Sequence, residues 1–425
     1  MIQIFEKNEL DPSEILRRDN AATGVESAVA EIIQNVRSRG DAALMEYCEK
    51  FDGAAPQYLE VSREEIDAAC TALEPEFLAV LEEAAANIRD FHSRQRRESL
   101  VVTREGGRVL GQKIMPLARA GVYVPGGTAC YPSTVLMNCI PAKIAGVPEV
   151  CVCTPAKNGE INPAILAAAK IAGADRVFRV GGAQAVAAMA YGTESIPRVD
   201  KITGPGNVFV AEAKRQVYGQ VDIDMIAGPS EILVVADEHT DPAWCAADML
   251  SQAEHDKNAA AVLVTTSREL AIAVRQQLEI QLADLPRQEI ARASIDNRGR
   301  IIIAGSIDEA IELANAIAPE HLELCLDEPF DWLDKVRCAG SVFLGRNCPE
   351  ALGDYLAGPN HTLPTGGSAR FSSPLSVDDF VKKTQFIYYS PAALDAVSGQ
   401  IQLFAAREGL EGHGRSVKIR GEAKK

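Results

Sequence analysis

The sequence contains few histidines and no Cys-x-x-Cys pair. Only 6 histidines occur among 425 residues, and the 10 cysteines lack the close pairing of a thiolate zinc site. Most cysteines lie in apolar segments such as 150–153, so we interpret them as buried thiols in a reducing cytoplasm rather than as disulfides. No apolar run approaches the ~20 residues of a membrane-spanning helix, and residues 1–7 lack the layout of a signal peptide.

Positive charge is also in short supply. The chain has 43 Lys and Arg against 59 Asp and Glu, a formal net charge of -16. This balance argues against nucleic acid or an anionic membrane as a partner, because their phosphates would be repelled. With 47% hydrophobic and 24% charged residues, the composition is that of a globular protein long enough for two or more domains. We expect a cytoplasmic protein that binds a small molecule.

Nucleotide-binding fingerprints are missing too. No Gly-x-Gly-x-x-Gly follows a predicted strand, and no Walker-type glycine loop occurs. Glycines nevertheless follow several predicted strands, at 126–127, 181–182 and 204–206. Tight strand-to-helix turns explain such glycines in any α/β protein. The functional alternative is a topological switch point, where Tyr123, Gln184 and Asn207 would face a ligand.

From residue 121 onwards, apolar strand patterns alternate with glycine turns and helical patterns. The predicted strands lie at 122–124, 150–153, 177–180, 201–203, 232–235, 261–264, 301–303, 321–326 and 341–344. Such alternation predicts parallel sheets with helices on both faces. We therefore predict an α/β protein with two doubly wound, Rossmann-like parallel-sheet domains, a helical N-terminal arm and a C-terminal tail.

Domain boundaries follow from where the pattern changes. Before residue 121, apolar spacing predicts helices at 25–40 and 44–52, two more that meet near Pro75, and a β-hairpin around 105–107. We expect an arm at 1–20, a first α/β domain at 21–120 and 231–377, a second at 121–230, and a helical tail at 378–425. The first α/β domain would carry the metal-binding and catalytic residues.

Gln252 and His255 begin a group of side chains that could bind a metal. Three residues apart, they share one face of a predicted helix. A solvated helix face is the commoner explanation of this spacing alone. Asp354 and His413 could complete a shell of nitrogen and oxygen donors, which suits Zn²⁺ without any thiolate.

Glu320 and His321 follow Pro319 and begin an apolar predicted strand. A histidine at a strand edge is usually structural. A strand start is nevertheless a rigid place for a base, and histidine titrates near neutral pH. The adjacent pair offers two proton acceptors of different basicity, which suits a reaction with two separate deprotonations.

Over nearly its whole length the sequence resembles the histidinol dehydrogenase family. The matching stretches are 121–127, 131–138, 180–185, 204–207, 227–231, 250–255, 319–322, 339–345, 353–355, 358–361 and Glu408 with His413. Each stretch is short, but their number and order make a chance match very rare. The resemblance implies a zinc-dependent, NAD-linked, four-electron oxidation of L-histidinol to L-histidine by way of histidinaldehyde, the last steps of histidine biosynthesis.

The resemblance also assigns roles to particular residues. The family's zinc ligands, one Zn²⁺ per subunit, correspond to Gln252, His255, Asp354 and His413. Its NAD-contacting positions correspond to Tyr123, Gln184 and Asn207, and its catalytic pair to Glu320 and His321. Its substrate-contacting positions correspond to Ser230, Gln252, His255, Glu320, Asp354, His361, Glu408 and His413. The family is a homodimer in which each tail crosses to the neighbouring subunit.

Three alternatives stay open at this stage. A zinc hydrolase would need no NAD, but the sequence lacks a His-Glu-x-x-His arrangement. A two-lobed binding protein without catalysis would be favoured by a signal peptide. A paralogous zinc- and NAD-dependent alcohol dehydrogenase could keep the zinc and base residues yet lose the tail, so Glu408 and His413 favour histidinol.

Overall fold

The computed structural model describes residues 1–10, 15, 24–126 and 130–422. The chain divides into two compact units, Met1–Gln95 with Leu117–Phe380, and Arg96–Pro116 with Val381–Lys425. Gly127 and part of the expected N-terminal arm (11–14 and 16–20) lie outside the described residues. The described helices include none with the length and apolar character needed to cross a membrane.

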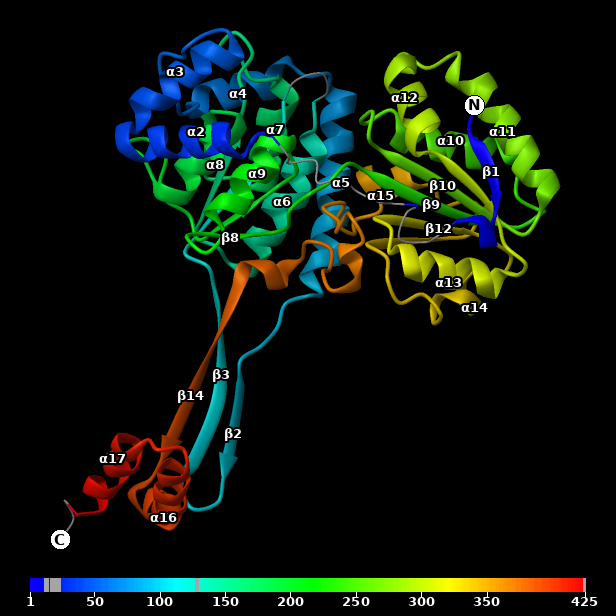
Figure 1. The fold of residues 1–425 in the computed structure, drawn as a ribbon. Helices are drawn as coiled ribbons and strands as arrows, with labels where there is room; N and C mark the ends of the chain where they lie inside the picture. The colour runs from blue at the N-terminus through cyan, green and yellow to red at the C-terminus, as the bar shows by residue number, and fades with distance from the viewer. Residues whose placement is uncertain (11–14, 16–23, 127–129, 423–425) are drawn as a thin grey trace. The chain divides into compact units, whose positions relative to one another are not determined.

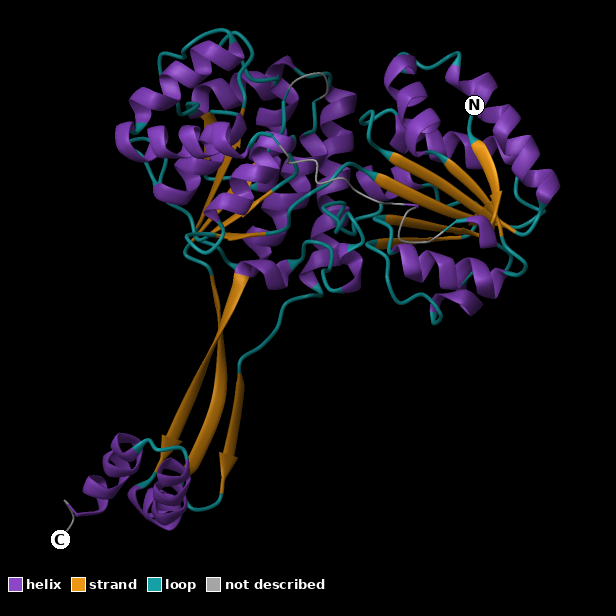
Figure 2. Cartoon of the chain, in the orientation of Figure 1, coloured by secondary structure: helices purple, strands orange, loops and turns teal. Residues whose placement is uncertain are grey.

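The larger unit contains two parallel sheets (Figure 2). One has five strands in the order β6-β5-β4-β7-β8. These are β4 (Arg119–Tyr123), β5 (Glu149–Thr154), β6 (Arg176–Arg179), β7 (Lys201–Thr203) and β8 (Asp222–Ile223). Because β5 and β7 flank β4, the sheet grows first to one side and then to the other, which creates a switch point at its carboxyl edge.

Helices cover both faces of the five-stranded sheet (Figure 1). On one face lie α4 (Arg63–Ala72), α5 (Pro75–Ser93), α6 (Pro132–Ala145) and α7 (Pro163–Ala172). On the other lie α2 (Glu26–Arg39), α3 (Asp41–Asp52), α8 (Gly182–Tyr191) and α9 (Val208–Val217). Val122 belongs to the first cluster and Tyr123 to the second, as alternation along a strand requires.

This packing corrects one expectation. We expected 21–120 to join 231–377, but the buried side chains of α2 to α5 share their clusters with the strands of 119–203. An amphipathic pattern shows that a helix buries one face, but it does not show which sheet receives that face.

The second sheet has six parallel strands in the order β1-β11-β10-β9-β12-β13. They are β1 (Gln3–Glu6), β9 (Glu231–Ala236), β10 (Ala260–Thr265), β11 (Arg300–Ile303), β12 (His321–Cys325) and β13 (Ser341–Leu344). One face packs against α10 (Pro242–Ala253), α11 (Arg268–Leu282) and α12 (Gln288–Arg298), the other against α13 (Ile307–Ile317). The two parallel-sheet assemblies confirm the predicted α/β class, and β1 adds an edge strand within the expected arm.

The order of these elements positions the site. Helix α10 follows β9 and packs against the sheet, so it runs antiparallel to that strand. Its carboxyl end therefore lies near the amino edge of the sheet, where β12 begins. After β13 come the short α15 (Glu350–Tyr355) and the loop that carries His361. The remaining short elements are α14 (Phe330–Leu333), η1 (Lys7–Glu9), η2 (Ser368–Arg370) and η3 (Val377–Phe380).

The smaller unit is an antiparallel sheet with two helices. Its strand order is β14-β3-β2, with β2 (Leu100–Arg104), β3 (Arg108–Pro116) and β14 (Val381–Tyr389). The β2–β3 connection confirms the predicted hairpin, and Gly106 and Gly107 both adopt positive φ there. The expected helical tail at 378–425 is helical in α16 (Pro391–Arg407) and α17 (Glu411–Glu422), but the expectation was wrong for residues 381–389, which form β14.

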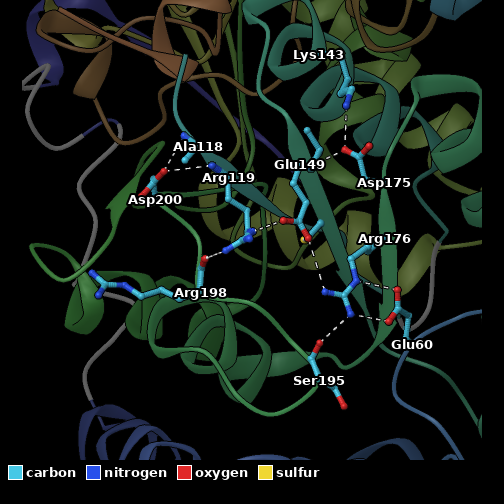
Figure 3. A network of polar contacts seen from close by, with 12 residues as sticks. Glu60, Ala118, Arg119, Lys143, Glu149, Asp175, Arg176, Ser195, Arg198 and Asp200 are labelled. Carbon is cyan, nitrogen blue, oxygen red and sulfur yellow. Dashed lines mark hydrogen bonds and ion pairs between the residues drawn. The ribbon is translucent and has the colours of Figure 1, made fainter. Parts of the chain in front are cut away.

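Ion pairs join the amino ends of the five-stranded sheet (Figure 3). Arg119, the first residue of β4, donates from Nε to Glu149 Oε2 at 2.5 Å, and Glu149 begins β5. Arg176, which begins β6, pairs with Glu60 at 2.6 Å. Because these groups are partly exposed, each pair contributes about 0–1 kcal/mol. The network therefore connects the first residues of neighbouring strands. It lies at the amino edge of the sheet, and the switch point lies at the carboxyl edge.

Candidate active site

His321 is the first residue of β12 and is almost fully buried. Its Nδ1 lies 2.9 Å from the carbonyl oxygen of Glu231, at the start of the neighbouring β9. A carbonyl only accepts, so Nδ1 carries the proton and Nε2 is the basic nitrogen. Burial lowers the pKa of His321 to about 4, which keeps the ring neutral at pH 7.

Glu320 and Glu231 connect the starts of β12 and β9 through two hydrogen bonds. The backbone N–H of Glu231 donates to Glu320 Oε2 at 2.8 Å, and the N–H of Glu320 donates to Glu231 Oε2 at 3.3 Å. Both side chains are buried. Ser230 immediately precedes Glu231, and its carbonyl accepts from the N–H of Ala260 at 3.0 Å. The predicted catalytic pair is thus held by backbone contacts at one sheet edge.

Helix α15 brings two carboxyl groups to His321. Glu350 and Asp354 stand four residues apart on this helix, and one ligand atom from each lies within 4.8 Å of the other and of a ring nitrogen of His321. Glu350 Oε1 is 3.6 Å from His321 Nε2. Sequence reasoning missed Glu350, although the i, i+4 spacing to Asp354 was a usable signal.

The same two carboxyl groups have opposite protonation tendencies. Burial, strengthened by the charge of Asp354, raises the pKa of Glu350 to about 8. Burial would also raise the pKa of Asp354, but a hydrogen bond from His361 and the nearby imidazoles hold it at about 2. At pH 7 Glu350 is therefore the neutral acid and Asp354 the carboxylate.

Gln252 and His255 lie at the carboxyl end of α10, beside α15. Gln252 is buried and hydrogen bonds to Glu350, while His255 is close enough to Asp354 for their charges to interact. Burial lowers the pKa of His255, which favours a neutral ring able to bind a metal. Three of the four predicted metal-binding residues thus come together.

His361 links this group to a small cavity. Its Nδ1 is 3.5 Å from Asp354 Oδ1, and its Nε2 is 3.4 Å from the hydroxyl of Thr134 on α6. The cavity has a volume of about 130 Å³, and its lining includes His321, Phe343, Cys348, Asp354, Asn360 and His361. A polar end and an apolar wall suit a small organic molecule with a few polar groups.

The predicted cofactor-contacting residues gather at the carboxyl edge of the five-stranded sheet. Tyr123 ends β4, and its hydroxyl accepts from the N–H of Gly182 at 3.1 Å; burial raises its pKa to about 12. Gln184 is buried in the first turn of α8. Asn207 caps α9, because its Oδ1 accepts from Phe209 at 3.0 Å and from Val210 at 3.2 Å. Gln184 follows β6 and Asn207 follows β7, so all three residues lie at the carboxyl edge of this sheet.

Glu408 and His413 belong to the smaller unit. Glu408 is the residue after α16, His413 lies in α17, and both are exposed.

Known proteins share this architecture. A family model described as histidinol dehydrogenase matches residues 15–421. A relative from Syntrophotalea carbinolica with that name is 57% identical over 408 residues, 96% of this chain and 95% of its own. One from Clostridium acetobutylicum is 51% identical over 426 residues, 99% of both. The solved histidinol dehydrogenase of Elizabethkingia anophelis is 38% identical, with a TM-score of 0.93 over 100% of this chain and 98% of its own.

A parallel α/β scaffold with a buried imidazole and carboxyl groups, matched over its full length by these relatives, defines an oxidoreductase of the dehydrogenase class. The chain belongs to the histidinol dehydrogenase family.

Proposed function

We propose that the chain oxidises L-histidinol to L-histidine by way of histidinaldehyde, with zinc and NAD, in the last steps of histidine biosynthesis. The observation that carries the proposal is the neutral, buried His321, fixed through Nδ1 and placed beside Asp354 and Glu350 at the cavity. Oxidation of an alcohol requires a base for the hydroxyl proton, and an oriented imidazole is the usual side chain for that role.

His321 would accept the hydroxyl proton at Nε2 in the first oxidation. Glu320 would then remove a proton from the water that attacks the aldehyde. After releasing its first proton to solvent, His321 would deprotonate the resulting diol in the second oxidation. The strand starts hold both groups in place, so no rearrangement of the main chain is required between the two oxidations.

The residues present fit a zinc ion. Gln252 Oε1 is buried and, within the described residues, has no hydrogen-bond partner, which leaves an oxygen donor for a cation. We propose that Gln252, His255, Asp354 and His413 hold one Zn²⁺ per subunit. When bound, the zinc would orient the amino and imidazole nitrogens of the substrate.

NAD would bind at the carboxyl edge of the five-stranded sheet. The hydroxyl of Tyr123, the carboxamide of Gln184 and the turn before Asn207 would contact it. Two NAD molecules, bound one after the other, would each accept the hydride of one oxidation.

We propose that Ser230, His361 and Glu408 contact the substrate together with Glu320 and the zinc ligands. We further propose a cytoplasmic homodimer in which the tail of each copy, with Glu408 and His413, completes the site of the other. Exposure of both side chains on the smaller unit is consistent with this arrangement.

The test is an assay of zinc-loaded protein with L-histidinol and NAD, with L-histidine identified by chromatography and mass spectrometry. We expect histidine to form with histidinol and not with simple primary alcohols of similar size. Oxidation of other alcohols but not of histidinol would replace the proposal with the paralogous alcohol dehydrogenase.

A further inference from the structure

A second pair of acidic side chains lies behind the active site, and the proposed reaction does not use it. Glu323 on β12 is buried, and it hydrogen bonds to Asp248 on α10. Two carboxyl groups can hydrogen bond only if one carries a proton. Burying them costs free energy that an apolar pair would not cost, so simple packing does not explain the pair.

Glu323 is directed to the active-site side of the sheet. Side chains two residues apart on a strand share a face, so Glu323 points to the same side as His321. Leu322 and Leu324 alternate with these two residues along β12, and they pack with α13 on the opposite face of the sheet.

Glu323 also caps α15. Its Oε1 accepts from the N–H of Glu350, the first residue of that helix, at 2.8 Å. Pro349, at the N-cap position, provides no side-chain cap of its own. Glu323 therefore fills the role of an N-cap acceptor from a neighbouring strand. The helix that it caps carries Glu350 and Asp354.

Asp248 makes the corresponding link to α10. Asp248 and Gln252 are four residues apart and share one face of α10, and His255 follows in the turn after the helix. Ser251 Oγ adds a bridge, because it lies 2.8 Å from the carbonyl of Asp248 and 3.3 Å from Glu350 Oε2. Asp248 and Glu323 thus connect α10, β12 and α15, the elements that carry or precede the residues of the candidate active site.

We propose that Asp248 and Glu323 are positioning residues, which hold Gln252, Asp354 and His321 in register for binding L-histidinol without touching the substrate. The inference rests on the proposed function. Hydrogen-bond partners one layer behind such groups set their orientation, and their loss typically reduces affinity or activity about 10–100-fold.

The experiment compares Glu323→Met, which keeps the volume but loses both hydrogen bonds, with Glu323→Gln, which keeps an acceptor and gains a donor toward Asp248. We expect Glu323→Met to raise the KM for L-histidinol about tenfold or more while the KM for NAD stays unchanged, and Glu323→Gln to restore most of the loss. Glu312→Gln, on the exposed side of α13, is the control and should match the unmodified chain.

A folded Glu323→Met variant with an unchanged KM for L-histidinol would overturn the inference, as would an equal rise in both KM values. If this variant does not fold, Asp248→Ser removes the other half of the pair from a half-buried position. It should raise the KM for L-histidinol alone, and an unchanged value would again overturn the inference. Failure of the unmodified chain to oxidise L-histidinol would instead refute the proposed function.

Discussion

Glu350 and Asp354 lie one turn apart on α15, and their pKa values are displaced in opposite directions, to about 8 and about 2. One carboxyl group keeps a proton while the other keeps a negative charge. Of these two groups, Asp354 is the one that presents a negative charge to His255, His321 and His361.

Replacement of Glu350 by glutamine should change stability in a pH-dependent way. The folded, metal-free chain keeps the Glu350 proton up to about pH 8, whereas the unfolded chain releases it near 4.5, so the unmodified chain loses stability as the pH rises between these values. Glutamine does not titrate. With a chelator present, Glu350→Gln should therefore melt at a higher temperature than the unmodified chain at pH 8, and the difference should shrink at pH 5. A constant difference would show that Glu350 is ionised throughout.

His321→Asn should lower kcat by roughly 10²–10⁴-fold, because the base for the hydroxyl proton is lost. The zinc content should remain near that of the unmodified chain. Steady-state kinetics and elemental analysis of the same preparation measure both quantities. A loss of zinc that parallels the loss of rate would make His321 a metal ligand, an arrangement that its distance to Glu350 and Asp354 also permits.

His255→Asn should lose both zinc and activity, since one of three converging ligand groups is removed. Equilibrium dialysis against zinc buffers checks the affinity, for which we expect a fall of at least about tenfold. Retained zinc together with a near-normal rate would exclude His255 from the metal site.

Asn207→Ala should raise the KM for NAD and also destabilise the chain by about 0.5–2 kcal/mol, because Asn207 caps α9. Ser267→Ala is the matched control, since Ser267 caps α11 in the same way. Denaturant unfolding should show similar losses for both variants, while only Asn207→Ala should affect NAD. Equal KM values for NAD in the two variants would show that Asn207 only caps α9 and does not contact NAD.

Much of the fold could be predicted from the sequence because apolar strands and helices alternate regularly after residue 121. The predicted strand at 150–153 lies within β5, and the predicted break at Pro75 separates α4 from α5. By contrast, β14 is mostly exposed and contains Lys382 and Lys383, so it shows no apolar alternation.

The active site could be predicted only in part. The resemblance selected Glu320, His321 and Asp354, and the structure brings Gln252 and His255 close to them. Glu350, Glu323 and Asp248 were missed because carboxyl groups are normally solvated, and only the tertiary packing of α10, β12 and α15 covers these three.

The most direct test of the account is the number of NADH molecules formed per L-histidinol consumed by the zinc-loaded protein, with a chelated control. The account predicts two NADH per substrate, with the activity lost on chelation and restored by zinc. One NADH with release of free aldehyde would contradict the second oxidation assigned to Glu320 and His321. No NADH at all would reject L-histidinol as the substrate.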